Sequence, residues 1–451
     1  MQRTRPAIAE FADKTATIAV VGLGKIGLPL AAQYIRHGRG VIGCDISPQV
    51  VRGINAGRSH VQEEPGLDEE VAAAVSTGRL RATGDTAQAV REARVIVVIV
   101  PVMVSDAHEV DFRAMDAASA AIGAGLGPGK LVIYETTLPV GTTSSRLRKA
   151  LEEASGLTAG EDFLLAYSPE RVSSGHIERD LRTYPKVVGG INKESTAAAE
   201  AFYRSVLGAP VMTMASTDDA EFVKLIETTY RDVNIALANE YARFADEHGL
   251  DLTSAVAAAN TQPYSHIHTA GAGVGGHCIP VYPYFLMRGA GADGLTLPRR
   301  SRAINDGMAE YAADRVESEI GPLAGRAVLL MGIAYRGDVK EHAFSTARLL
   351  RTALERRGAT VYAHDPLYDD REITALGYTP FRPELAGEIA AIVVQAAHSA
   401  YQTFDFTPFA ECRVVLDGRR GLDSAAAAAV EAAGMRYLYI GDGRRAGDGA
   451  R

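Results

Sequence analysis

The chain reads Thr17-Ile-Ala-Val-Val-Gly-Leu-Gly-Lys-Ile-Gly27 near its N-terminus. The β-branched run before the glycines predicts a buried parallel strand, and the stretch Leu28–His37 after them predicts a helix. A second predicted strand, Gly40–Cys44, ends at Asp45, 18 residues beyond Gly27. A strand, a G-x-G-x-x-G turn, a helix, a strand and an acid in this order form a dinucleotide-binding fingerprint.

The glycines of this turn let a pyrophosphate approach the N-terminus of the helix, where free N–H groups and the helix dipole favour an anion. Asp45 can accept hydrogen bonds from an adenosine ribose and repel a 2′-phosphate, so the sequence favours NAD over NADP. The residues expected to bind this cofactor are Gly22, Gly24, Lys25, Ile26, Gly27, Asp45, Pro101 and Thr137.

Three more strands of the same sheet are predicted at Val95–Val100, Leu131–Tyr134 and Phe163–Tyr167, separated by helical stretches. Loops that follow such strands lie at the carboxyl edge of the sheet, where ligands bind. Thr137 and Glu170 fall in these loops and are candidate site residues.

One long helix is predicted from Ser216 to about Glu247, capped by Ser216 or Thr217. About 30 residues at ~1.5 Å each give a length of roughly 45 Å, typical of helices that bridge domains or form a dimer interface. Lys224 and Thr228 share one face of this helix.

A second βαβ unit begins near Gly325. It comprises the predicted strand Ala327–Met331, a helix over Ser345–Arg357, and a strand over Ala359–Ala363 that leads to Asp365. Further buried strands are predicted at Ala390–Gln395, Arg413–Leu416 and Arg436–Ile440. The predicted fold class is therefore α/β, with two Rossmann-like doubly wound domains joined by a long central helix.

The composition is that of an ordinary globular protein. The 451 residues are 47% hydrophobic and 23% charged, long enough for two or three domains. The net charge of −8 argues against nucleic acid or an anionic membrane as a partner. No apolar run approaches the ~18 residues of a membrane span, and the N-terminus lacks a signal-peptide core, so we expect a cytoplasmic protein. The three cysteines are too widely spaced for a disulfide framework or a metal cluster, and we expect no metal.

One cysteine, Cys278, ends the glycine-rich stretch Gly271-Ala-Gly-Val-Gly-Gly-His-Cys278. The glycines let the backbone approach a ligand closely. A thiol beside a nicotinamide suggests oxidation of an alcohol past the aldehyde, through a covalent thioester. The alternative is a free cysteine that packs as a small hydrophobic side chain.

Together these motifs resemble the UDP-glucose/GDP-mannose dehydrogenase family, and within it the UDP-N-acetylmannosamine and UDP-N-acetylglucosamine 6-dehydrogenase branch. The resemblance covers nearly the whole chain. Besides the fingerprint, it rests on Glu135-Thr-Thr-Leu-Pro-Val-Gly-Thr-Thr143, Ser168-Pro-Glu-Arg171, Lys224-Leu-Ile-Glu-Thr-Thr-Tyr-Arg-Asp-Val-Asn-Ile-Ala236, Gly273-Val-Gly-Gly-His-Cys-Ile-Pro-Val281, Arg302-Ala-Ile-Asn-Asp306 and Ala334-Tyr-Arg-Gly-Asp-Val339.

The resemblance implies an NAD-binding domain over residues 1–210, a helical dimerisation domain with the cysteine loop over 211–315, and a nucleotide-sugar-binding domain over 316–451. It also implies a homodimer formed through the central helix. In such a family two successive hydride transfers turn the C6 alcohol of a nucleotide-linked sugar into a carboxylate.

The resemblance further implies roles for single residues. Cys278 takes the position of the catalytic thiol, and Lys224 that of a lysine that stabilises the oxyanion. Glu170 matches a glutamate that assists water in thioester hydrolysis, and Thr137 a threonine near the reacting carbon. The implied substrate-binding residues are Glu170, Arg171, Lys224, Tyr264, Gly273, Gly275, Tyr335 and Arg336.

Several positions depart from the family pattern. Tyr282 stands where the family has an aspartate near the cysteine, and a phenol of pKa near ~10 is no anionic base at neutral pH. Thr228 replaces an asparagine of the oxyanion site, although its hydroxyl can still donate one hydrogen bond. Ala343 replaces an arginine associated with ligand phosphates, and Tyr264 an arginine that reaches the partner subunit's substrate. Val102-Met103 replaces a Thr-Pro pair.

Thr228 and Tyr282 remain candidate catalytic residues, and Tyr264 with Tyr282 can form an altered pocket wall for a different sugar. We interpret the chain as a diverged dehydrogenase that converts a UDP-N-acetylhexosamine to the uronic acid. The alternatives are an enzyme that stops at the aldehyde or uses another sugar, and a protein that binds NAD and a nucleotide sugar without turnover. A β-hydroxyacid dehydrogenase is a further alternative, but that class needs neither the cysteine loop nor a second Rossmann-like domain.

Overall fold

The computed structural model describes residues 7–61, 64–105, 109–172, 175, 177–291 and 294–444. The chain forms two compact units. Unit 1 holds the residues up to Glu227 together with Tyr284–Gly289, and unit 2 holds Thr228–Pro283 and the residues from Ala290 onward.

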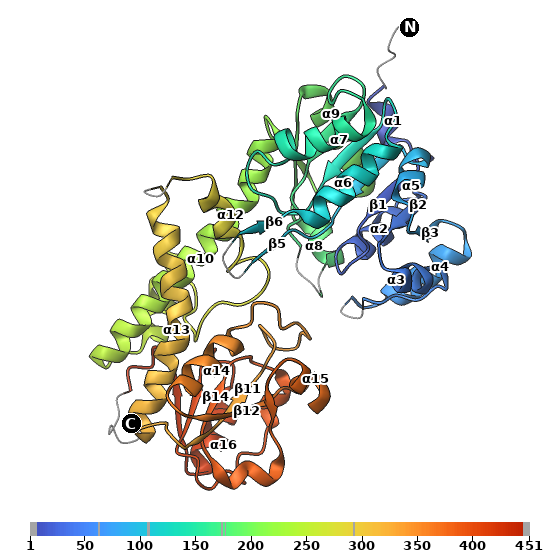
Figure 1. Ribbon diagram of the computed structural model, residues 1–451. Helices are drawn as coiled ribbons and strands as arrows, with labels where there is room; N and C mark the ends of the chain where they lie inside the picture. The colour runs from blue at the N-terminus through green and yellow to red at the C-terminus, as the bar shows by residue number, and fades with distance from the viewer. Residues whose placement is uncertain are drawn as a thin grey trace. The chain divides into compact units, whose positions relative to one another are not determined.

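Unit 1 is built on an eight-stranded sheet in the order β10-β9-β8-β7-β4-β1-β2-β3 (Figure 1). Its strands are β1 (Ile18–Val21), β2 (Val41–Cys44), β3 (Leu80–Thr83), β4 (Val95–Val98), β7 (Leu131–Tyr134), β8 (Leu164–Tyr167), β9 (Lys186–Gly190) and β10 (Val211–Thr213). The six neighbouring strands β3, β2, β1, β4, β7 and β8 are parallel, and the apolar runs predicted all of them except β3. The sequence did not predict β9 and β10, and β9 runs antiparallel to β8.

Helices cover both faces of this sheet, which confirms the doubly wound prediction. They are α1 (Ala9–Ala12), α2 (Gly27–Arg36), α3 (Pro48–Asn55), α4 (Leu67–Ser76), α5 (Thr86–Glu92), α6 (Arg113–Gly125), α7 (Arg148–Ser155), α8 (Ile177–Thr183) and α9 (Lys193–Val206). Side chains of α2, α4 and α9 pack with Ile18, Val20 and Val95 in one core. Helices α5, α6 and α7 pack in succession on the opposite face (Figure 1). A short hairpin, β5 (Met103–Val104) and β6 (Val110–Asp111), follows β4.

Unit 2 contains a six-stranded parallel sheet in the order β13-β12-β11-β14-β15-β16. Its strands are β11 (Ala327–Met331), β12 (Thr360–His364), β13 (Thr379–Pro380), β14 (Ile389–Val394), β15 (Val414–Asp417) and β16 (Arg436–Tyr439). Helices α13 (Thr296–Ile320), α14 (Thr346–Arg356) and α15 (Asp370–Ala375) supply side chains to the core on one face, and α16 (Ser424–Ala432) to the core on the other. The second Rossmann-like domain is therefore confirmed.

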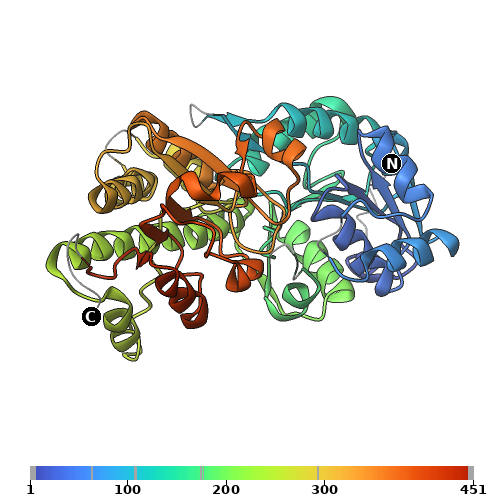
Figure 2. The same cartoon turned by 90° about the horizontal axis from the view of Figure 1, so that it is seen from below.

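The predicted long helix is α10 (Thr217–His248), the yellow-green helix of Figures 1 and 2. Its 32 residues correspond to about 48 Å at ~1.5 Å per residue. Ser216 caps it, since the Ser216 Oγ accepts a hydrogen bond from the Asp219 N–H at 3.1 Å. The helix continues without a break from unit 1 into unit 2.

A buried polar group ties the second half of α10 to α13 within unit 2. The Arg302 guanidinium lies 2.6 Å from Asp232 Oδ1, and Asn305 Nδ2 donates to the same oxygen at 2.8 Å. Asp232 and Asn305 are 0% exposed and Arg302 is 3% exposed. The stretch Arg302-Ala-Ile-Asn-Asp306 thus serves the packing of two helices. None of the described helices is long and apolar enough to cross a bilayer.

Candidate active site

The glycine turn after β1 has the shape that a dinucleotide requires. Gly22 has a φ of +95°, and a Cβ there would lie 2.9 Å from the Ile99 carbonyl oxygen. A Cβ on Gly27 would lie 1.9 Å from the Gly22 carbonyl oxygen, so this glycine allows the helix to approach the strand. A Cβ on Gly24 would meet no atom within 4 Å, which leaves open space beside the turn. No side chain caps the N-terminus of α2, so its dipole faces that space.

Asp45 stands beside this turn. Its Oδ2 accepts a hydrogen bond from the Leu23 N–H at 3.0 Å, and its Oδ1 accepts one from the Ser47 N–H at 2.9 Å. The side chain is half-buried, so the carboxylate keeps an accessible side. The open space at Gly24, the uncapped helix and this carboxylate together fit NAD.

The acid at the corresponding position in unit 2, Asp365, forms hydrogen bonds with groups of the protein itself. Asp365 is 2% exposed, and its Oδ2 accepts hydrogen bonds from the Ile333 and Ala334 N–H groups at 2.7 and 3.0 Å. The His398 Nε2 lies 3.1 Å from the same oxygen. A carboxylate with these partners cannot also bind a ribose, so we assign dinucleotide binding to unit 1.

The other predicted cofactor residues lie around the same edge of the sheet. Lys25 is exposed and Ile26 is the half-buried N-cap of α2. Pro101 is exposed beyond the end of β4, and Thr137 is 5% exposed in the loop that follows β7.

The carboxyl ends of β7 and β8 and the start of β9 bring together two glutamates and one lysine. The Lys186 Nζ lies 2.7 Å from Glu135 Oε2 and 2.9 Å from Glu170 Oε2. Glu170 Oε1 accepts hydrogen bonds from the backbone N–H groups of Arg171 and Val172 at 2.7 and 3.1 Å. The predicted water-directing residue, Glu170, is therefore held from both of its oxygens.

These contacts separate the pKa values of the two carboxyl groups. Burial raises the pKa of Glu135 to about 7, although the Lys186 ammonium opposes this effect. Burial also acts on Glu170, but Lys186, the Glu135 carboxyl group and the Arg171 N–H together outweigh it and lower the pKa of Glu170 to about 2.

Arg171, predicted to bind substrate, lies in the same loop of unit 1. Its Nε is 2.9 Å from Glu227 Oε2, and its Nη1 donates to the Pro185 carbonyl oxygen at 3.2 Å. The predicted oxyanion residues Lys224 and Thr228 are one turn apart on α10 and are 7% and 4% exposed.

The loop that carries Thr137 is fixed by a buried carboxyl group on α10. Glu221 is 0% exposed, and its two oxygens accept hydrogen bonds from the Gly141 and Thr143 N–H groups at 2.6 and 2.8 Å. Burial raises the pKa of Glu221 to about 7, against the effect of these two donors.

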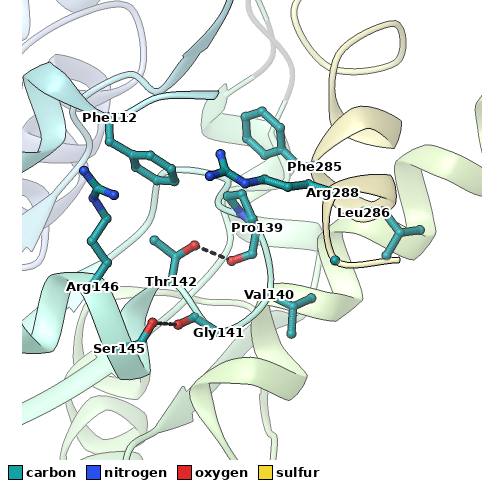
Figure 3. Close-up of a pocket in the computed structure, with 11 residues that line it drawn as sticks. Phe112, Pro139, Val140, Gly141, Thr142, Ser145, Arg146, Phe285, Leu286 and Arg288 are labelled. Carbon is teal, nitrogen blue, oxygen red and sulfur yellow. Dashed lines mark hydrogen bonds between the residues drawn. The ribbon is translucent and has the colours of Figure 1, made fainter. Parts of the chain in front are cut away.

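On the other side of this loop lies a pocket of about 290 Å³ within unit 1. Figure 3 shows the guanidinium groups of Arg146 and Arg288 on either side of the Phe112 ring, 4.5 and 5.8 Å from its centroid. The Thr142 Oγ1 donates to the Pro139 carbonyl oxygen at 2.6 Å, and Arg146 pairs with Asp116 on α6. Thr142 and Arg146 are thus bonded within the protein itself, and we do not assign this pocket to the substrate.

In unit 2 the cysteine loop is built onto the second Rossmann-like domain. A Cβ on Gly273 (φ +138°) would lie 2.5 Å from Thr346 Cγ2, and a Cβ on Gly275 would lie 2.9 Å from Tyr335 Cβ. The Arg419 Nη1 donates to the Gly273 carbonyl oxygen at 2.7 Å. The glycines therefore allow close packing of the loop on the domain that follows it.

Cys278 itself is partly exposed at the end of this loop. Its carbonyl oxygen accepts a hydrogen bond from the Tyr282 N–H at 2.9 Å, at the start of α12 (Tyr282–Arg288). The side chain of Cys278 is therefore not fully buried.

The substituted positions Ala343 and Tyr264 also lie in unit 2. The Ala343 N–H donates to Glu341 Oε1 at 3.1 Å in the turn before α14. Arg336 lies 5.8 Å from the Tyr335 ring centroid, so these predicted substrate residues are neighbours. Tyr264 is 89% exposed.

Sequence reasoning missed Glu135, Lys186, Glu221 and Arg419 as parts of the site. A usable signal existed for Lys186, because a lysine opens the otherwise apolar run Lys186-Val-Val-Gly-Gly190. Glu135 directly follows the fully buried strand β7 and is the first residue of the motif Glu135–Thr143. Glu221 and Arg419 carry no such signal, because their partners are backbone groups distant in the sequence.

The fold and the glycine turn define a dinucleotide-binding protein with a second Rossmann-like domain. Family models agree along the chain. The UDP-glucose/GDP-mannose dehydrogenase family matches with its NAD-binding domain over residues 16–207, its central domain over 218–306 and its UDP-binding domain over 329–424.

Individual relatives cover almost the entire chain. The UDP-N-acetyl-D-mannosamine dehydrogenase of Pyrococcus horikoshii is 34% identical over 415 residues, which are 89% of this chain and 95% of the relative. The NDP-N-acetyl-D-galactosaminuronic acid dehydrogenase of Ralstonia nicotianae is 35% identical over 418 residues, which are 91% and 96% of the two chains.

Solved structures give the same result. The UDP-D-ManNAc dehydrogenase of Pyrococcus horikoshii superposes with a TM-score of 0.84 at 31% identity and covers 95% of this chain and 99% of its own. A UDP-glucose dehydrogenase of Pyrobaculum islandicum gives 0.83 at 28% identity, with 95% and 98% covered. The chain belongs to the UDP-glucose/GDP-mannose dehydrogenase family, and it is an NAD-dependent nucleotide-sugar dehydrogenase.

Proposed function

We propose that the protein oxidises the C6 alcohol of a UDP-linked N-acetylhexosamine to the uronic acid, through a covalent intermediate on Cys278. The names of the relatives from Pyrococcus horikoshii and Ralstonia nicotianae support an N-acetylhexosamine as the sugar. We further propose that residues 1–210 bind NAD, residues 211–315 form the central domain and residues 316–451 bind the nucleotide of the sugar.

The observation that carries this proposal is the environment of the three cysteines. Cys44 and Cys412 are buried, and burial raises the pKa of each thiol to about 12. Cys278 is partly exposed at the end of a glycine loop. Because the thiolate is the reactive form of cysteine and must reach the substrate, Cys278 alone among the three suits a nucleophile.

When bound, NAD supplies the hydride acceptor for two oxidations. Gly22, Gly24, Gly27 and Asp45 hold it, with Lys25, Ile26, Pro101 and Thr137 as further cofactor contacts. The Cys278 thiolate adds to the C6 aldehyde and gives a thiohemiacetal, whose oxidation gives a thioester.

The remaining residues act around this thioester. Lys224 stabilises the oxyanion electrostatically, and the Thr228 hydroxyl donates one hydrogen bond. Glu170 directs water at the thioester. Tyr282 supplies a neutral phenol beside the thiol in place of an acid. The substrate itself is held by Glu170, Arg171, Lys224, Tyr264, Gly273, Gly275, Tyr335 and Arg336.

A homodimer through the central helix is part of the proposal. Large apolar side chains of α10 are between 40% and 61% exposed at Phe222, Ile226, Tyr230, Leu237, Tyr241 and Phe244. Exposed apolar surface of this extent on one helix is typical of an interface. Light scattering at micromolar concentration should give twice the chain mass of 47.8 kDa, and a monomer would overturn this part.

Cys278→Ala tests the covalent mechanism. The variant should bind NAD with wild-type affinity and form no uronic acid, because the thioester cannot form. Cys412→Ala is the matched control, since it removes a buried thiol of the same unit and should keep acid formation. Uronic acid from Cys278→Ala at the wild-type yield, measured by mass spectrometry of the nucleotide sugar, would refute the mechanism.

A further inference from the structure

Glu135 and Lys186 lie beside Glu170 but have no role in the mechanism described so far. The three side chains come from the ends of β7 and β8 and the first residue of β9. Their exposures increase from Glu135 (0%) through Lys186 (6%) to Glu170 (11%). The Lys186 Nζ touches one oxygen of each carboxyl group, at 2.7 and 2.9 Å. A fully buried carboxyl group is thus connected through a lysine to one that is partly exposed.

The inner carboxyl group is enclosed by donors. Glu135 Oε1 accepts hydrogen bonds from the Tyr34 hydroxyl of α2 at 3.1 Å and from the Tyr203 hydroxyl of α9 at 2.7 Å. Burial raises the pKa of both phenols well above 10, so they stay neutral donors. The charged groups that face Glu135 are therefore Lys186 and Glu170.

Charge balance makes this group a proton acceptor near neutral pH. Two ionised carboxylates and one ammonium carry a net charge of −1, and burial disfavours an uncompensated charge. One bound proton makes the group neutral. The raised pKa of Glu135, about 7, and the lowered pKa of Glu170, about 2, describe this one proton held by a coupled pair.

We propose that Glu135, Lys186 and Glu170 act as one proton-accepting unit in thioester hydrolysis, in which Glu170 meets the water and Glu135 stores the proton. This proposal rests on the proposed function. Glu170 is held in an ion pair with Lys186, yet the hydrolysis step requires a base. In this proposal the two glutamates together are the base, and Lys186 and Glu135 are positioning residues.

The water oxygen bonds to the thioester carbonyl carbon, the C–S bond breaks, and the sulfur leaves as the thiolate of Cys278. One water proton passes to Glu170 Oε2 and on to Lys186 Nζ, while Lys186 gives a proton to Glu135 Oε2. The new carboxylic acid loses its proton to solvent, and Glu135 releases the stored proton before the next turnover.

The experiment separates hydride transfer from hydrolysis. Wild type, Glu135→Gln, Lys186→Met and the double variant are mixed with NAD and UDP-N-acetyl-D-mannosamine, and NADH and the protein mass are followed through one turnover. Lys130→Met is the matched control, because Lys130 is a partly buried lysine of the same unit that binds the Arg91 and Ala93 carbonyl oxygens. The double variant avoids placing an amide donor against the lysine, and thermal melting checks that each variant folds.

We expect the variants to form two NADH per site at the wild-type rate and then to stop, with the uronyl nucleotide bound covalently to Cys278. Hydrolysis should slow by about 10²-fold, the usual contribution of a general base. In wild type the hydrolysis rate should rise with pH through about 7, as Glu135 ionises, and this rise should be absent in Glu135→Gln. The control should behave as wild type.

Three results overturn the proposal. They are wild-type hydrolysis in the folded variants, NADH formation that slows by the same factor as hydrolysis, and an unchanged pH profile in Glu135→Gln. Failure of the proposed function is seen separately, in the wild-type arm, as the absence of any protein-bound intermediate on Cys278.

Discussion

Replacing Gly24 by alanine separates cofactor binding from folding. A Cβ at Gly24 would meet no protein atom within 4 Å, and the same is true of Gly40 just before β2. A Cβ at Gly27 would instead lie 1.9 Å from the Gly22 carbonyl oxygen. Gly24→Ala and Gly40→Ala should therefore fold normally, with a gain of about 0.4–1 kcal/mol from the stiffer unfolded chain where the backbone conformation suits alanine. Gly27→Ala should lose about 1–3 kcal/mol or more through the clash.

The three variants should differ in a second way when NAD is added. The open space at Gly24 is where we place the pyrophosphate, so the new methyl group clashes with the ligand alone. An overpacking cost of about 1–3 kcal/mol raises the Kd for NAD by about 5- to 150-fold. Gly40→Ala should keep the wild-type Kd. Titration calorimetry with NAD and thermal melting measure the two effects, and wild-type affinity in Gly24→Ala would refute the placement of the pyrophosphate.

Two further predictions concern buried charges. Arg302→Met leaves the buried Asp232 carboxylate without its positively charged partner, although Asn305 still donates to it. The free energy of unfolding should fall by about 3–5 kcal/mol in urea titrations, and a loss below about 1 kcal/mol would contradict the assigned role. The pKa of Glu221 in the folded protein is about 7, above its ordinary value of 4.5. Between these two pH values the folded protein keeps a proton that the unfolded chain has released. The stability that this proton contributes is therefore lost as the pH rises from about 4.5 to 7. Glu221→Gln should flatten that part of the stability profile, and equal slopes in both proteins would show that another group titrates there.

The fold was predictable because its signals are local. Val95–Val98 and Leu131–Tyr134 are short apolar runs of buried residues, and the glycine turn marks the first crossover. The strand Lys186–Gly190 was missed because it begins with a lysine and ends with two glycines, and its direction depends on the partner strand β8. Residue type predicted that Ser216 or Thr217 caps the long helix, and the structure shows that Ser216 does so.

The candidate site was predictable only in part. The residue types at Cys278, Lys224 and Glu170 stand in motifs, so resemblance could locate them. The ion pairs of Lys186 join residues 16 and 51 positions apart, and no periodicity in the sequence reports such contacts. The pKa of a carboxyl group also depends on its burial and its neighbours, so the difference in pKa between Glu135 and Glu170 could be found only from the structure.

The central claim is that a thioester on Cys278 carries the sugar through two oxidations. The most direct test is the number of NADH molecules formed per molecule of UDP-N-acetyl-D-mannosamine consumed by the wild-type protein. The account predicts two NADH per sugar, with the uronic acid as product. One NADH per sugar, with an aldehyde or a ketone as product, would contradict it.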